Sequence, residues 1–132
     1  MLPQENSQRF IIVDDNNIDL YIAERIINSA FENAEVIKFT EAANSLEFLS
    51  QQEKHPPTTI LLDIYMPEMD GFGFLEEFAN LSETIRNNYK IVILTSSSNQ
   101  LDISRAQSNP HVVHMTQKPF TQVSLLHLFK NQ

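Results

Sequence analysis

Short runs of β-branched and other apolar residues alternate along this chain with longer segments that repeat apolar residues at helical spacing. The five runs span residues 10–13, 36–39, 59–62, 91–94 and 112–115. Most of their residues are apolar without strict alternation, which is typical of strands covered on both faces in a parallel sheet. A chain with this alternation is expected to fold as an α/β domain.

The segments between the runs predict helices, because their apolar residues recur every three or four positions and share one face. The stripes are formed by Ile18, Tyr21, Ile22 and Ile26, by Ala42, Leu46 and Leu49, by Phe74, Leu75, Phe78 and Leu81, and by Val123, Leu126 and Phe129. Segment 101–106 is more polar and predicts a weaker helix, with Ser98 or Asn99 at its N-cap. Asp70 is expected to cap the helix after the third run. Right-handed crossovers then predict a doubly wound α/β sandwich.

A length of 132 residues fits one compact domain, and a hydrophobic content of 42% is enough to fill its core. The polar start, 1–7, is expected to be a flexible tail before a domain spanning 8–132. The formal net charge of −8 argues against direct binding of nucleic acid, which needs a basic surface. The sequence has no cysteine and shows neither a signal peptide nor a membrane-sized apolar run, so we expect a cytoplasmic protein that does not enter a membrane.

Side chains capable of chemistry follow four of the five runs. Asp14 and Asp15 follow the first run, Asp63 the third, Thr95 the fourth and Lys118 the fifth. Because the carboxyl ends of parallel strands meet at one edge of a sheet, these residues are expected to share one shallow site.

The residue types at this edge indicate phosphoryl chemistry. Close carboxylates repel one another unless a cation lies between them. Oxygen ligands without histidine or cysteine favour Mg²⁺, which often shares its coordination shell with a phosphate. A lysine and a threonine can bind phosphoryl oxygens, and an aspartate can attack phosphorus to form an aspartyl phosphate.

Four segments together resemble the signature of response-regulator receiver domains of two-component signalling. They are Val13-Asp14-Asp15, the stretch LDIYMPEMDG at 62–71, Leu94-Thr95-Ser96 and Lys118-Pro119-Phe120. Their order and spacing agree with that family over almost the whole chain. The resemblance implies a flavodoxin-like fold, with five helices around a five-stranded parallel sheet of order 2-1-3-4-5. It also suggests a stand-alone, chemotaxis-regulator-like receiver.

By this resemblance, Asp63 is the phosphoacceptor and becomes an aspartyl phosphate. Asp14, Asp15, Asp63 and the main-chain carbonyl of Tyr65 are then expected to bind Mg²⁺. A receiver of this kind phosphorylates itself from its donor and has no separate substrate, so it is not an enzyme in the usual sense.

The same resemblance assigns the remaining residues of the edge. Thr95 is expected to donate its hydroxyl to the phosphoryl group, and the small Ser96 permits a close approach. Lys118 is expected to pair with Asp63 before phosphorylation and with phosphoryl oxygens afterwards. The bond between Lys118 and Pro119 is expected to be cis.

Met115 departs from the family pattern, in which an aromatic residue commonly lies three positions before the lysine. A thioether repacks easily but has neither a ring nor a hydroxyl. Met115 therefore lacks the ring of the usual rotating aromatic switch, and His114 or Phe120 nearby could contribute to a switch instead. Tyr65 is expected either to control access to the acyl phosphate or simply to pack on its loop.

The resemblance implies a sensor histidine kinase or a phosphotransfer protein as the phosphodonor. The output is expected to be a protein contact or onward transfer through the fourth helix, fifth strand and fifth helix, about 99–130. The resemblance also allows a phosphorylation-dependent homodimer.

Two other functions fit parts of the sequence. A metal-dependent phosphatase with an aspartate nucleophile commonly carries a second acid two residues later, where this chain has Tyr65. A degenerate receiver used only for binding is the other alternative. Asp14 and Asp15 could also merely cap the first helix. His127 is expected to be a partly buried helix residue rather than a phosphohistidine.

Overall fold

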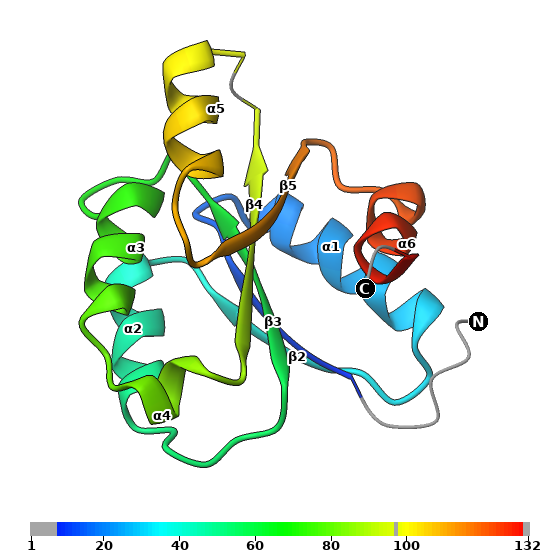
Figure 1. Cartoon of the computed structure of the whole chain (residues 1–132). Coiled ribbons are helices and arrows are strands. Elements are labelled where there is room, and N and C mark those ends of the chain that lie inside the picture. Colours follow the sequence, from blue (N-terminus) through cyan, green and yellow to red (C-terminus); the bar gives the residue numbers. More distant parts are fainter. Residues whose placement is uncertain (1–7, 97, 131–132) are drawn as a thin grey trace.

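The computed structural model of this chain describes residues 8–96 and 98–130, so the predicted tail at 1–7 lies outside the described residues. Five parallel strands form one sheet in the order β2-β1-β3-β4-β5 (Figure 1). Their bounds are β1 Arg9–Val13, β2 Glu35–Phe39, β3 Thr58–Asp63, β4 Tyr89–Thr95 and β5 Val112–Gln117. Each predicted apolar run therefore lies in a strand, and the predicted strand order is confirmed.

Helices cover both faces of this sheet. They are α1 Asn17–Ala30, α2 Ala42–Ser50, α3 Gly71–Ala79, α4 Glu83–Arg86, α5 Gln100–Gln107 and α6 Gln122–Lys130. Helices α1 and α6 lie on one side of the sheet, whereas α2, α3, α4 and α5 lie on the other (Figure 1). No helix among the described residues is both long and apolar enough to span a membrane.

The prediction of five helices was wrong by one, because the described residues contain six. The extra helix, α4, is a single turn between α3 and β4. The Ser82 hydroxyl caps it by accepting the backbone N–H of Ile85, and Ile85 is buried against the core. The helices predicted as fourth and fifth are therefore α5 and α6.

Two apolar cores lie on the two faces of the sheet. One packs β1, β3 and β4 against α2, α3, α4 and α5, and the other packs the same strands against α1 and α6. The central residues Ile60, Leu61 and Leu62 of β3 are fully buried. Burying one such side chain contributes roughly 1.5–3 kcal/mol, so the middle of β3 holds the site residue at its end firmly.

Helix α5 is attached more weakly than the other long helices. Asn99 caps it by accepting the backbone N–H groups of Leu101 and Asp102, as one of the two predicted caps. Only Ala106 of this helix is buried, and Leu101 is 81% exposed. A helix with so little buried apolar surface can move at small cost in free energy.

Candidate functional site

The carboxyl ends of β1 and β3 bring three acidic residues together. Val13 at the end of β1 pairs with Leu62 of β3, so Asp14 and Asp63 follow at neighbouring positions of the same edge. One carboxylate oxygen from each of Asp14, Asp15 and Asp63 lies within 4.8 Å of the others. The expected cluster of acids therefore forms.

These acids differ in their exposure to solvent. Asp14 is 2% exposed and Asp63 is 6% exposed, whereas Asp15 is exposed. None of them caps α1, because the N-cap is Asn16, whose side chain accepts two backbone N–H groups of the first turn. Asp14 instead accepts the backbone N–H of Asn16 at 2.9 Å, which fixes its carboxylate at the edge. The capping alternative for Asp14 and Asp15 was therefore wrong.

Lys118 reaches into this acidic cluster from the end of β5. Its Nζ lies 2.7 Å from Asp14 Oδ2, 2.9 Å from Asp19 Oδ2 and 3.4 Å from Asp63 Oδ2. The expected pair with Asp63 is thus the longest of three contacts. The sequence did not predict the contact with Asp19, which lies in the first turn of α1, four residues after Asp15.

The electrostatics leave Asp63 easier to protonate than an ordinary aspartate. Burial raises its pKa from 3.8 to about 6, although the charge of Lys118 opposes this shift and the nearby Asp14 adds to it. Burial lowers the pKa of Lys118, but hydrogen bonds to Asp14 and Asp19 and the charge of Asp63 outweigh it, so the pKa is raised overall. A firmly charged ammonium therefore faces an acid whose charge is poorly compensated.

The other side of the site is built by the ends of β4 and β5. Thr95 is fully buried, and its main-chain carbonyl accepts the backbone N–H of Lys118 at 2.9 Å. Ser96, the residue directly after β4, is exposed. The bond between Lys118 and Pro119 is cis, as predicted. Thr95 and Lys118 are thus held together by their backbones.

The loop after Asp63 turns away from the site within a few residues. The backbone N–H of Gly71 donates to the Ile64 carbonyl at 2.7 Å, which closes the loop. A Cβ at position 71 would lie 2.8 Å from Asp63 O and from Ile64 Cα, so only glycine fits this approach. Asp70 caps α3 by accepting the backbone N–H of Gly73, as predicted.

Tyr65 connects the phosphoacceptor to α5. Its backbone N–H donates to Asp63 Oδ1 at 3.4 Å, and its hydroxyl donates to Asp102 of α5. One helical turn later, the Arg105 guanidinium stacks over the Phe72 ring of α3, 4.0 Å from its centroid. The expectation that Tyr65 only packs on its loop was therefore wrong, because its hydroxyl forms a hydrogen bond with Asp102 of α5.

Met115 lies on the face of β5 that packs against the α2–α5 core, where it is partly buried. Phe120, which also follows β5, belongs to the opposite core beside α1 and α6. On the α2–α5 side of the sheet, the end of β5 thus presents a flexible thioether, at the position that pairs with Ile93 of β4.

The donor set of this site suits a hard divalent cation. Three carboxylates converge, one of them open to solvent, and none of the described side chains in the group is a histidine or a cysteine. Mg²⁺ prefers oxygen ligands in small number and retains water molecules. The residues present therefore fit the ion that was predicted from the sequence.

Comparisons with known proteins point to one family. A family profile described as the response regulator receiver domain matches residues 10–130. The chain is 30% identical over 114 residues to sporulation initiation phosphotransferase F of Bacillus subtilis, covering 86% of this chain and 84% of that protein. Several other relatives are longer proteins, of which this chain spans 8% to 38% of the length.

Solved structures agree with this assignment. A response regulator receiver protein from Dyadobacter fermentans is 32% identical and superposes with a TM-score of 0.85, covering 94% of this chain and 96% of that one. The receiver domain of a sensor histidine kinase from Pseudomonas aeruginosa, with a magnesium ion coordinated in its active-site cleft, shares the fold at 21% identity and a TM-score of 0.76, covering 96% and 97%. With the family profile matching almost its full length, this chain belongs to the response regulator receiver domains.

Proposed function

We propose that this receiver is a phosphoacceptor switch of a two-component phosphorelay, in which Asp63 takes a phosphoryl group from a histidine kinase or a phosphotransfer protein. One observation carries the proposal. Asp63 is a buried acid at the end of a rigid strand, with Lys118 Nζ 3.4 Å away and two further carboxylates within 4.8 Å. Positioning and charge neutralisation are most of what phosphoryl transfer requires.

The residues of the site divide the work of this transfer. A carboxylate oxygen of Asp63 forms the new bond to phosphorus while the phosphorus–nitrogen bond of the donor imidazole breaks, and the departing imidazole takes up a proton. Thr95 and Lys118 donate hydrogen bonds to the phosphoryl oxygens. Mg²⁺, when bound by Asp14, Asp15, Asp63 and the Tyr65 carbonyl, neutralises charge on the phosphoryl group.

The domain formed by 8–132 is proposed to act in the cytoplasm. The phosphodonor protein is proposed to dock beside α1. Helix α1 begins two residues after Asp15, and its stripe of Ile18, Tyr21 and Ile22 is largely exposed. Exposed apolar side chains next to a reactive group are suited to bind a partner that must reach it.

An acyl phosphate offers a direct test of this function. The protein, incubated with Mg²⁺ and acetyl phosphate, is expected to gain the mass of one phosphoryl group, as measured by intact-protein mass spectrometry. The adduct should disappear at alkaline pH and should not form in the presence of a chelator. An unchanged mass under these conditions would contradict the proposal, and rapid turnover of phosphate esters would favour a phosphatase.

The signal is proposed to leave the site through α5, β5 and α6, with Tyr65 in place of an aromatic switch at Met115. Tyr65 contacts Asp63 through its backbone and Asp102 through its hydroxyl, so it joins the phosphoacceptor to a helix with one buried residue. A phosphoryl group on Asp63 changes the local charge and offers new acceptor oxygens. That change would alter the position of Tyr65 and release α5.

A Tyr65→Phe variant tests this route. It is expected to accept the phosphoryl group normally, because its backbone contacts remain. Its α5 amides should exchange faster with deuterium before phosphorylation, and phosphorylation should change this rate less than in the wild type. The matched control is Tyr21→Phe, which removes the hydroxyl of an exposed tyrosine on α1. Equal protection of α5 in both variants and the wild type, in either state, would refute this role of Tyr65.

A further inference from the structure

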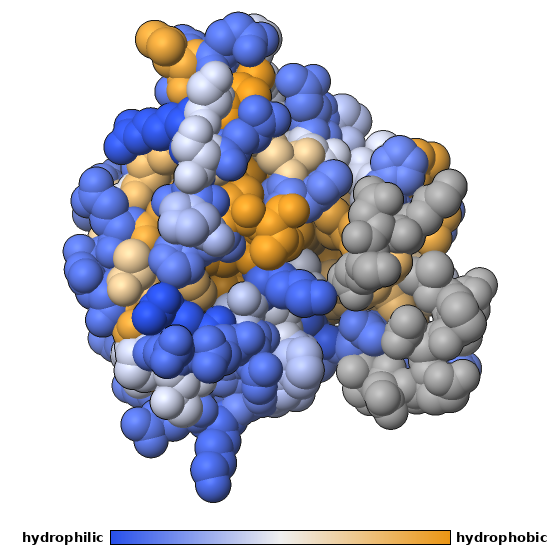
Figure 2. All heavy atoms as spheres, viewed as in Figure 1, coloured by the Kyte–Doolittle hydropathy of each residue, from blue (hydrophilic) through white to orange (hydrophobic). Residues whose placement is uncertain are grey.

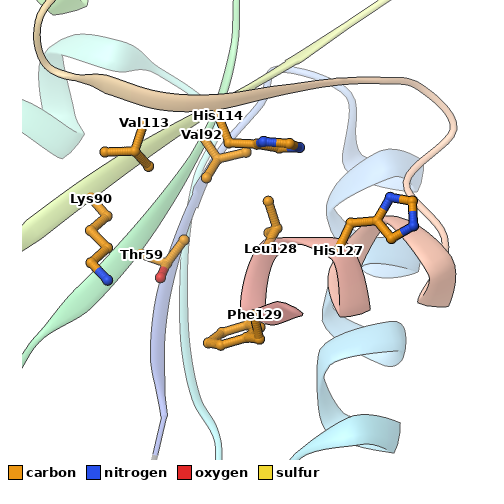
Figure 3. A pocket seen from close by; sticks show the side chains of 8 residues that line it. All are labelled: Thr59, Lys90, Val92, Val113, His114, His127, Leu128 and Phe129. Carbon is orange, nitrogen blue, oxygen red and sulfur yellow. The ribbon is translucent and has the colours of Figure 1, made fainter. Parts of the chain in front are cut away.

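A hollow of about 350 Å³ lies between β5 and α6, away from the phosphorylation site. Eight residues line it, namely Thr59, Lys90, Val92, Val113, His114, His127, Leu128 and Phe129 (Figure 3). Thr59 and Lys90 are the second residues of β3 and β4, whereas Asp63 is the last residue of β3. The hollow therefore opens towards the amino ends of these strands and is distinct from the acidic edge.

An irregularity of β5 contributes to this hollow. Ile91 pairs with Val112, but the next residue, Val92, pairs with His114, so Val113 is an extra residue in the ladder. Such a bulge bends a strand and redirects its side chains. Val113 is accordingly 59% exposed at the hollow, and His127 of α6 is exposed there too, not partly buried as predicted. Apolar atoms are visible in the middle of this face in Figure 2.

The lining combines an apolar wall with basic groups. Val92 and Leu128 face each other from sheet and helix, with Lys90 on one side of them and His114 and His127 on the other (Figure 3). All three ionisable residues among the eight are basic, although the whole chain carries a net charge of −8. A hollow of this kind favours an occupant with a negative charge and an apolar body.

A second hollow of about 360 Å³ adjoins the first and shares Thr59, Lys90 and Phe129 with it. Its other lining residues are Gln8, Pro57, Thr58, Asn87 and Asn88. In this second lining Lys90 is the one ionisable residue, and the amides and hydroxyls around it can donate hydrogen bonds. Lys90 thus stands between an apolar compartment and a polar one.

We propose that this pair of hollows binds a small carboxylate with an apolar chain, such as a medium-chain fatty acid. The carboxylate would lie against Lys90 and the Thr59 hydroxyl, and the chain would extend between Val92, Val113 and Leu128. The volume of each hollow lies within the range of ordinary ligand pockets, roughly 300–1,000 Å³. The site is independent of phosphoryl transfer, since no lining residue of either hollow belongs to the acidic edge.

Titration calorimetry with decanoate tests this proposal on the intact protein. Decanoate is expected to bind with a dissociation constant on the order of 1 mM or tighter. Decanol and decyltrimethylammonium share the chain but lack the carboxylate, and both should bind at least about tenfold more weakly. Equal binding of the three compounds, or no binding of decanoate, would overturn the proposal.

Three variants locate the site. Lys90→Glu should weaken decanoate binding at least about tenfold, because it reverses the charge at the junction of the hollows. Val113→Trp should also weaken it by filling the apolar compartment from an exposed position. Lys54→Glu makes the same charge change at an exposed lysine outside both linings and should leave binding unchanged. A loss of binding in Lys54→Glu as large as in Lys90→Glu would show general electrostatic attraction and would refute the site.

Discussion

Replacing Asp63 by asparagine is expected to abolish phosphorylation and, at the same time, to stabilise the metal-free protein at neutral pH. The first effect follows because the amide cannot act as the nucleophile towards phosphorus. The second follows from burial, which raises the pKa of Asp63 from 3.8 to about 6 and makes the ionised form unfavourable in the folded state. The two effects can be measured separately, by intact mass and by thermal or urea unfolding.

The sign of the pH dependence follows from proton binding. Between pH 3.8 and about 6 the folded protein holds a proton on Asp63 that the unfolded chain has released, so stability falls as pH rises through this window. The difference in pKa corresponds to at most about 3 kcal/mol at pH 7. Asp63→Asn should therefore match the wild type near pH 4 and exceed it by about 1–3 kcal/mol at pH 7, in chelator.

Magnesium provides the control for this comparison. Mg²⁺ is expected to stabilise the wild type at pH 7 by binding the folded state, and to stabilise Asp63→Asn much less. If the asparagine variant is less stable than the wild type at pH 7 in chelator, burial of Asp63 is not the dominant effect on its pKa.

Replacing Lys118 by alanine is expected to have the largest effect on stability. Its ammonium is the described cation nearest to two buried carboxylates, Asp14 and Asp63, which would be left without a cation. Removing one partner of a buried ion pair typically costs about 3–5 kcal/mol. The loss should shrink as the pH is lowered, because Asp63, whose pKa burial raises to about 6, then becomes neutral.

Lys38→Ala is the matched control for this variant. Lys38 lies as close to Glu24, at 2.7 Å, as Lys118 does to Asp14, but this pair is exposed to solvent. Exposed pairs contribute about 0–1 kcal/mol. Urea unfolding of both variants separates the two cases, and similar stability of both would contradict the role given to Lys118. The rate of phosphorylation by acetyl phosphate should also fall about 100-fold in Lys118→Ala.

Much of the fold could be predicted, because local pattern and global packing agree along this sequence. The residues at 10–13 and 60–62 are buried on both faces, and continuous apolar character is the expected mark of such strands. The caps at Asp70 and Asn99 also follow a local rule, since a short polar side chain precedes an apolar stripe. The turn α4 was missed because four residues are too few to show periodicity.

The composition of the site could be predicted better than its contacts. Strand ends identify Asp14, Asp15, Asp63, Thr95 and Lys118, because a parallel sheet places them at one edge. The pairing of Lys118 with Asp19 depends on the angle at which α1 leaves the edge. The contact between Tyr65 and Asp102 joins residues 37 positions apart. Local sequence patterns indicate neither the angle of a helix nor a contact between residues so far apart in the chain.

The register of the sheet determines whether a copy of this chain can be phosphorylated. Asp63 is the last residue of β3, and Asp14 and Lys118 directly follow β1 and β5. Each is brought into place by pairing between segments that are far apart in the chain. Because side chains alternate along a strand, a slip of one residue would turn Asp63 to the wrong face of the sheet. A chain that has not finished folding thus has no competent acceptor. Only molecules that have folded completely could then be phosphorylated, and misfolded copies would not produce a signal.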